Sequence, residues 1–209
     1  MSPQRRLLAL GDSYSIGEAV AEAERWPVQL TAALCAEGHA LGSPQILATT
    51  GWTTDELAAA LDRAALMPAW TLVSLQIGVN DQYRGRSVAA LREGFRLLLA
   101  RAIAFAGGTA RRVLVVSIPD WGVTPFARAG GHDAARIGAE IDACNAAERA
   151  LTAAAGAHWV DVTALSRVAG AELAVDGLHP GPAQYRHWLT ALLPAARGAL
   201  GERRSAPAP

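Results

Sequence analysis

Five short apolar or β-rich runs recur along this chain of 209 residues, and a segment with helical patterning separates each run from the next. The runs cover residues 6–10, 46–50, 71–77, 113–118 and 158–162. Such alternation predicts parallel strands joined by crossover helices. The runs at 71–77 and 113–118 are nearly continuously apolar or small, which is typical of central strands covered by helices on both faces.

The segments between these runs carry the expected helical signals. Apolar residues recur at intervals of three and four between residues 88 and 103, and Gly107-Gly108 then predicts the end of that helix. Thr53 and Glu56 form a capping-box pattern ahead of residues 57–66.

We therefore expect one α/β domain over residues 1–200, built as a three-layer α/β/α sandwich around a parallel five-stranded sheet, and a flexible C-terminal tail at residues 201–209. The length suits a single domain with a sizeable core. In open sheets of this kind, ligands bind beyond the carboxyl ends of the strands.

Charge and composition exclude several classes of function. The formal net charge is zero, so nothing predicts binding to nucleic acid or to an anionic membrane surface. The chain has no lysine, which excludes a Schiff-base lysine, a Ser-Lys dyad and the lysine of a phosphate-binding P-loop. No Cys/His cluster has metal-ligand spacing, and we expect Cys35 and Cys144 to be reduced thiols.

The N-terminal apolar run is too short for the core of a signal peptide. No uninterrupted apolar stretch approaches the roughly 20 residues that a bilayer span needs. These features favour a cytoplasmic protein with no stable membrane insertion. They leave the oligomeric state open.

The segment from Gly11 to Gly17 carries the first chemical signal, because it places Ser13 where the first strand turns into a helix. A serine hydroxyl is a poor nucleophile until a base removes its proton and donors await the oxyanion. Candidate partners stand after later strands. His179 is a possible base, Asp176 is a possible orienting group, and the donors are the backbone N–H groups of Ser13 and Gly51 and the side-chain amide of Asn80.

Each of these signals also has an ordinary explanation. Ser13 or Asp12 is a suitable helix cap, Asn80-Asp81 is a suitable polar turn, and Asp176-Gly177 is a common turn pair. The functional interpretation gains weight because four weak motifs occupy four functional loop positions of one predicted sheet.

Together, Gly11-Asp12-Ser13, Gly51, Gly78-x-Asn80-Asp81 and Asp176-x-x-His179 resemble the four sequence blocks of the SGNH, or GDSL-like, hydrolase superfamily. The resemblance spans nearly the whole predicted domain. It implies a flavodoxin-like sandwich, a catalytic triad of Ser13, His179 and Asp176, and an oxyanion hole of Ser13, Gly51 and Asn80. Tyr14 stands where the family motif has leucine, a difference that concerns pocket shape.

Four aromatic residues are candidate pocket walls: Tyr14, Trp52, Trp121 and Phe126. Trp121 and Phe126 lie in a proline-flanked loop after the fourth strand, and burial in the core is the alternative for both. A second loop with Glu18, Glu22 and Glu24 lies near the site, where acidic residues disfavour anionic substrates.

The sequence thus predicts a serine esterase that hydrolyses small or short-chain acyl or aryl esters through an acyl-serine intermediate, without metal or cofactor. The expected partner is a small-molecule ester. An acyltransferase or thioesterase using the same triad is the nearest alternative. A flavin- or phosphate-binding module is an alternative from another class, because Ser13-x-Ser15-x-Gly17 is a possible phosphate cradle. A catalytically dead ester- or glycan-binding protein is a third.

Overall fold

The structure is a computed structural model that describes residues 4–67, 69–168 and 170–201. The tail predicted at residues 201–209 lies outside the described residues, except for Gly201. The prediction of flexibility there stays a prediction.

The five strands form one parallel sheet in the order β2-β1-β3-β4-β5. This is the flavodoxin-like order of a doubly wound sheet, so the predicted fold class is confirmed. The strands are β1 (Gln4–Gly11), β2 (Gln45–Ala48), β3 (Trp70–Gln76), β4 (Val113–Val116) and β5 (His158–Val160).

Four of the five strands, β2 to β5, end one or two residues earlier than the sequence predicts. For β4 and β5 the reason is that apolar residues continue into the loops that follow them. Ile118 and Val162 are fully buried, yet both lie beyond their strands. Their backbone N–H groups donate to side chains instead of a strand ladder: Ile118 N to Asn145 Oδ1 at 2.9 Å, and Val162 N to Ser117 Oγ at 2.9 Å. A prediction from hydrophobicity alone therefore counts these buried loop residues as part of the strands.

Helices fill the connections between the strands and cover both faces of the sheet. The longer ones are α2 (Trp26–Ala36), α3 (Thr54–Arg63), α5 (Val88–Phe105), α7 (Ala134–Ala155) and α9 (Pro182–Leu200). The short ones are α1 (Ser13–Ile16), α4 (Val79–Tyr83), α6 (Pro125–Ala129) and α8 (Thr163–Ser166), with 3₁₀ turns η1 (Glu22–Glu24), η2 (Ala110–Arg112) and η3 (Trp121–Val123). The predicted capping box is present, since Glu56 Oε2 accepts from Thr53 N at 2.8 Å.

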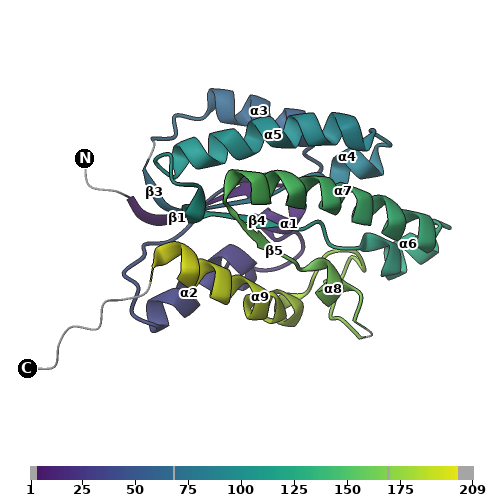
Figure 1. Ribbon diagram of the computed structural model, residues 1–209. Coiled ribbons are helices and arrows are strands. Elements are labelled where there is room, and N and C mark those ends of the chain that lie inside the picture. The colour runs from purple at the N-terminus through teal and green to yellow at the C-terminus, as the bar shows by residue number, and fades with distance from the viewer. Residues whose placement is uncertain (1–3, 68, 169, 202–209) are drawn as a thin grey trace, which may run out of the picture.

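Three layers result, with α3, α5 and α7 on one side of the sheet and α2 and α9 on the other (Figure 1). Alternate residues of a strand serve opposite layers, as the pleat requires. Leu8 and Val73 belong to the core beneath α3 and α5, whereas Leu7 and Leu72 belong to the core that includes α2 and α9.

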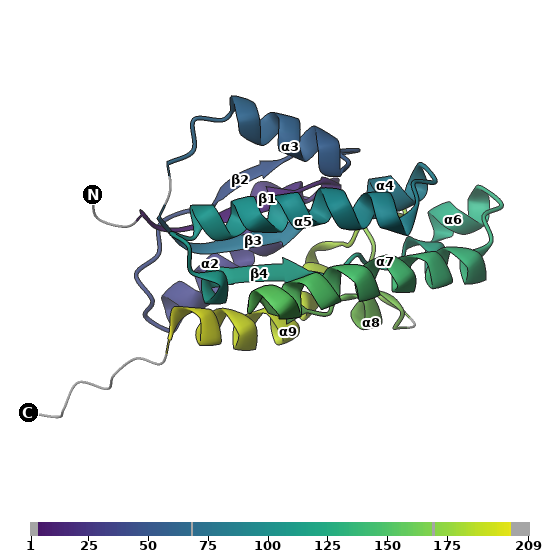
Figure 2. The same ribbon diagram turned by 45° about the horizontal axis from the view of Figure 1, so that its top comes forward.

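The strands point toward the end of the sheet at which α4, α6 and α8 lie (Figure 2). The loops that carry Ser13, Gly51 and Asn80 leave the sheet at that end, because they follow β1, β2 and β3. In the described ranges, no helix is long and apolar enough to cross a membrane.

Candidate active site

Ser13 is the first residue of α1 and follows β1 after a sharp turn. The N-cap is Asp12, whose Oδ1 accepts from the backbone N–H of Tyr14 at 3.0 Å. Gly11 has no room for a side chain, because a Cβ there would lie 2.2 Å from Ser15 Oγ and 2.4 Å from the Gln76 carbonyl oxygen. This close packing fixes the position of Ser13 at the strand end.

Ser15 points away from the site. It is fully buried, and its hydroxyl donates to Gln76 Oε1 at 3.4 Å. Trp26 Nε1 donates to the same oxygen at 3.2 Å. Ser15 is thereby part of the core, which removes one of the two hydroxyls of the phosphate cradle that the sequence left open.

His179 and Asp176 lie in the loop before α9 and are bonded to each other. The distance from His179 Nδ1 to Asp176 Oδ2 is 2.6 Å. Asp176 Oδ1 accepts from the backbone N–H groups of Leu178 at 2.9 Å and His179 at 3.0 Å. Partial burial raises the pKa of Asp176. The hydrogen bond with the His179 ring and the two backbone N–H bonds outweigh burial, so the pKa lies below its ordinary value.

The candidate oxyanion donors follow two other strands. Gly51 has a φ of +86°, a conformation that favours glycine, and Arg84 Nη2 donates to its carbonyl oxygen at 2.7 Å. Asn80 lies in the first turn of α4 and donates one amide N–H to the Trp52 carbonyl oxygen at 2.9 Å. That bond orients the Asn80 amide, whose second N–H makes no hydrogen bond to any described residue.

Asp81 ties the Asn80 loop to the start of α3. Its two carboxyl oxygens accept from Thr54 N at 2.9 Å and from Thr54 Oγ1 at 2.8 Å, and Arg86 Nη1 lies 3.2 Å from Oδ1. Burial nonetheless raises the pKa of Asp81 above its ordinary value. The residue has a structural role, because it holds the loops after β2 and β3 together.

A cavity of about 220 Å³ brings the predicted site residues together. Ser13, Gly51, Asn80 and His179 all line it, although they come from loops far apart in the sequence. Across the described residues, the Ser13 hydroxyl makes no side-chain hydrogen bond. Catalytic hydrogen bonds are often long before a substrate binds, so this geometry agrees with a nucleophile and a base that meet at a substrate.

The predicted pocket aromatics divide into two groups. Tyr14, Trp121 and Phe126 line the same cavity, with the Trp121 and Phe126 ring centroids 6.3 Å apart. Trp121 is also nearly fully buried and donates from Nε1 to Gln82 Oε1 at 2.8 Å. The side chain of Trp52 packs instead against the core beneath α3 and α5, and the structure does not bring it to the cavity.

Sequence reasoning missed several cavity residues, of which Tyr83 is the largest. Its ring lies 5.3 Å from that of Trp121, centroid to centroid. A signal existed, because Tyr83 stands three residues after Asn80 and therefore on the same side of a helix. Thr50, Val79 and Leu178 also line the cavity.

Three buried carboxyl groups lie near the site and influence one another. Burial raises the pKa of Asp12 to about 7. The charge of Asp81 also raises this pKa, whereas the hydrogen bond from the Tyr14 backbone N–H lowers it. Glu148 on α7 is fully buried, and neither of its carboxyl oxygens has a hydrogen-bond partner among the described residues. Burial raises its pKa well above the ordinary value, and the charges of Asp81 and Asp12 add to the shift. Burial therefore favours the protonated, neutral form of Glu148.

The arrangement has the components of acyl transfer: a serine at a helix start, a histidine held by a carboxylate, and convergent N–H donors. Among the described residues, no group of three or more His, Cys, Asp or Glu side chains is arranged to hold a metal ion.

Solved structures with this fold include several hydrolases. The crystal structure of the lipase Lip_vut3 from a goat rumen metagenome has a TM-score of 0.76 at 17% identity, and the match covers 94% of this chain and 99% of that one. TesA has a TM-score of 0.72 at 22% identity, with 93% and 99% covered. The psychrotrophic esterase EstA from Pseudoalteromonas sp. has a TM-score of 0.71 at 16% identity, with 95% and 100% covered.

Curated proteins give no significant match to this sequence. The model of the GDSL-like Lipase/Acylhydrolase family, by contrast, matches residues 9–187. That range includes the serine, glycine, asparagine and Asp-x-x-His segments and all five strands after the first residues of β1. The chain therefore belongs to the GDSL-like Lipase/Acylhydrolase family of hydrolases.

Proposed function

We propose that this protein is a serine esterase that hydrolyses small or short-chain carboxylic esters through an acyl-Ser13 intermediate. One observation carries the proposal. Ser13, Gly51, Asn80 and His179 line one cavity, and Asp176 is hydrogen-bonded to Nδ1 of His179. Binding of a flavin or a phosphate does not require the hydrogen-bonded pair of His179 and Asp176.

In the acylation step, Ser13 Oγ attacks the ester carbonyl carbon while His179 Nε2 removes its proton. Asp176 holds Nδ1–H, which fixes the tautomer and stabilises the imidazolium that forms. The carbonyl oxygen becomes an oxyanion, and the N–H groups of Ser13, Gly51 and Asn80 stabilise it. The intermediate then collapses, the bond to the alcohol oxygen breaks, and His179 gives the proton to the departing alcohol.

Deacylation repeats these steps with water as the nucleophile. His179 removes a proton from water, the resulting hydroxide attacks the acyl carbon, and the second oxyanion occupies the same donors. Collapse releases the carboxylic acid, and the proton returns to Ser13 Oγ. An alcohol in place of water gives acyl transfer, and a thioester in place of an ester gives thioesterase activity by the same route.

The cavity supports a small acyl or aryl group. Its volume of about 220 Å³ is below the range of roughly 300 to 1,000 Å³ that is usual for pockets of drug-sized ligands. Its walls include the rings of Trp121, Phe126 and Tyr83, which suit an apolar group.

A chain-length series tests this proposal. We expect kcat/KM to be highest for p-nitrophenyl acetate or butyrate and to fall for the octanoate, and we expect Ser13→Ala to abolish turnover of all three. Equal turnover by Ser13→Ala contradicts the proposal. The same assay with a butyryl thioester, and with added alcohol acceptors, separates esterase, thioesterase and acyltransferase activity by product.

A further inference from the structure

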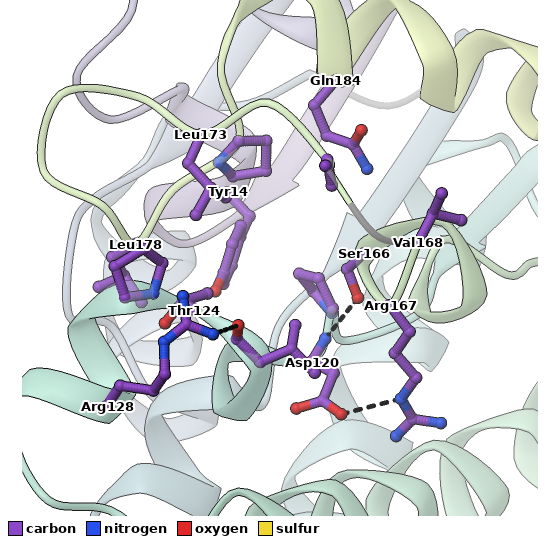
Figure 3. Close-up of a pocket in the computed structure, with 16 residues that line it drawn as sticks. Tyr14, Asp120, Thr124, Arg128, Ser166, Arg167, Val168, Leu173, Leu178 and Gln184 are labelled. Atoms are coloured by element: carbon purple, nitrogen blue, oxygen red, sulfur yellow. Dashed lines mark hydrogen bonds and ion pairs between the residues drawn. The ribbon is translucent and has the colours of Figure 1, made fainter.

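A second cavity of about 300 Å³ adjoins the catalytic cavity. It lies between the segment that leads from β4 into α6 and the loops on either side of the Asp176 turn (Figure 3). Tyr14 and Leu178 line both cavities and therefore form the wall between them. The proposed esterase mechanism does not use this second cavity.

Tyr14 contributes a buried polar group to the second cavity. Its side chain is only 3% exposed, and Figure 3 shows it directed into the cavity. The hydroxyl has no hydrogen-bond partner within the described ranges, and it is not fully shielded from solvent, so it is open to a ligand in the cavity. Burial, with the charges of Asp12, Asp176 and Asp120, raises the pKa of the phenol, so the hydroxyl remains a donor.

The Tyr14 ring also touches the catalytic base. Its centroid lies 5.3 Å from that of His179, and its backbone carbonyl accepts from the Tyr185 hydroxyl at 3.1 Å. Leucine, the residue of the family motif that the sequence resembles, has neither the ring nor the hydroxyl. The ring contacts explain the ring of Tyr14 but not its hydroxyl.

The two arginines that line the second cavity differ in their partners. Arg167 is neutralised, because Nε lies 2.8 Å from Asp120 Oδ2 and Nη2 lies 2.8 Å from Asp142 Oδ1. Arg128 makes one hydrogen bond, from Nη1 to the Val123 carbonyl oxygen at 3.2 Å, and no ion pair with any described residue. Arg128 is therefore a guanidinium at the cavity without a carboxylate partner among the described residues.

We propose that the second cavity binds a carboxylate, which the Arg128 guanidinium and the Tyr14 hydroxyl hold beside the catalytic pocket. The remaining N–H groups of Arg128 form a fork that matches a carboxylate, and Tyr14 donates a further hydrogen bond. A carboxylate supplies the acid partner that Arg128 lacks among the described residues.

The carboxylate has two possible sources. It is carried on the ester that reacts at Ser13, for example at the far end of a dicarboxylic half-ester, or it belongs to a separate small acid. The first source rests on the proposed esterase function, and the second does not.

Two measurements on the full-length protein distinguish the sources. The first is the ratio of kcat/KM for mono-p-nitrophenyl glutarate to that for p-nitrophenyl butyrate. The second is the thermal shift produced by free glutarate. Both are made on the wild type, Arg128→Gln, Tyr14→Phe and the control Arg92→Gln, whose arginine is exposed on α5, away from the site.

If the substrate carries the carboxylate, we expect Arg128→Gln to lower the ratio about tenfold and Tyr14→Phe to lower it several-fold, with no change in Arg92→Gln. If a separate acid binds, the ratio is unchanged by all three substitutions, but glutarate raises the Tm of the wild type and not that of Arg128→Gln. The proposal is overturned if neither effect occurs, or if Arg92→Gln changes the ratio as much as Arg128→Gln. Failure of the wild type to hydrolyse p-nitrophenyl butyrate refutes the proposed function alone, and the glutarate shift then decides about the cavity.

Discussion

His179 Nδ1 lies 2.6 Å from Asp176 Oδ2, and only two residues separate them in the chain. The second Asp176 oxygen accepts two backbone N–H groups of the same turn. One short loop therefore supplies the proposed base, the carboxylate bonded to it, and the hydrogen bonds that hold that carboxylate in place. Ser13, by contrast, comes from the opposite end of the chain, so the His179–Asp176 pair forms without it.

Replacement of Asp176 by asparagine is expected to keep the loop but to place the wrong tautomer of His179 toward Ser13. We expect kcat for p-nitrophenyl acetate to fall by roughly 10³- to 10⁴-fold, with the melting temperature little changed. Asp62→Asn is the matched control, because Asp62 is exposed and pairs with Arg101 far from the site. A loss in Asp176→Asn of less than tenfold contradicts the role given to Asp176.

Replacement of Asn80 by alanine removes one of the proposed oxyanion donors. We expect kcat to fall by about 10²- to 10³-fold while KM changes little, since the oxyanion exists only in the transition state and intermediate. Steady-state kinetics with p-nitrophenyl butyrate measures both constants. A rise in KM at constant kcat would instead mean that Asn80 binds the ground state.

The fold was predictable because its signals repeat. Strand and helix patterns alternate five times, and parallel strands place every following loop at one end of the sheet. Short motifs after β1, β2 and β3 were therefore expected to meet a motif from the loop before α9. Ser13, Gly51, Asn80 and His179 do line one cavity.

Other parts of the site were not predictable, because they depend on side-chain direction and on packing between distant elements. Trp52 follows Gly51 directly, yet its side chain joins the core and only its carbonyl oxygen reaches Asn80. Glu148 lies on the buried stripe of α7, four residues after Cys144, but the type of the residue argues against burial, because a carboxyl group is rarely found in a core without a partner. The second cavity is lined largely by loops, and no periodic sequence pattern predicts the conformation of a loop.

The buried Glu148 is expected to make the protein less stable as pH rises. Its folded-state pKa is raised, so the folded protein binds a proton that the unfolded chain releases above about pH 4.5. The free energy of unfolding therefore falls as pH increases from about 4.5 toward the folded-state pKa. Glu148→Gln stays neutral at every pH, and we expect it to remove this part of the slope and to be more stable than the wild type at pH 8.

Urea unfolding at pH 5, 6, 7 and 8 measures this effect. Glu93→Gln is the control, because Glu93 is exposed and pairs with Arg96 on α5, and its substitution is expected to leave the slope unchanged. An identical pH slope in the wild type and Glu148→Gln shows that Glu148 is ionised in the folded protein, against our account.

Gly78 is expected to tolerate no side chain. Its φ is +120°, and a Cβ there would lie 2.7 Å from Glu148 Oε1 and 3.1 Å from carbons of Ile118 and Leu91. We expect Gly78→Ala to lower the free energy of unfolding by about 2 kcal/mol or more, since it combines backbone strain with overpacking. Gly85→Ala is a control with a positive φ of 71° but open space around the Cβ, and it is expected to lose less in the same urea titration.

The most direct test of the account is covalent trapping of the nucleophile. The protein is incubated with an aryl alkylphosphonate ester, digested, and examined by mass spectrometry for the modified serine. We predict complete labelling of Ser13, none of Ser15, and loss of esterase activity in proportion to the label, because Ser13 lines the cavity whereas Ser15 is buried against Gln76. A label on Ser15, or loss of activity with Ser13 unmodified, contradicts the central claim that Ser13 is the nucleophile.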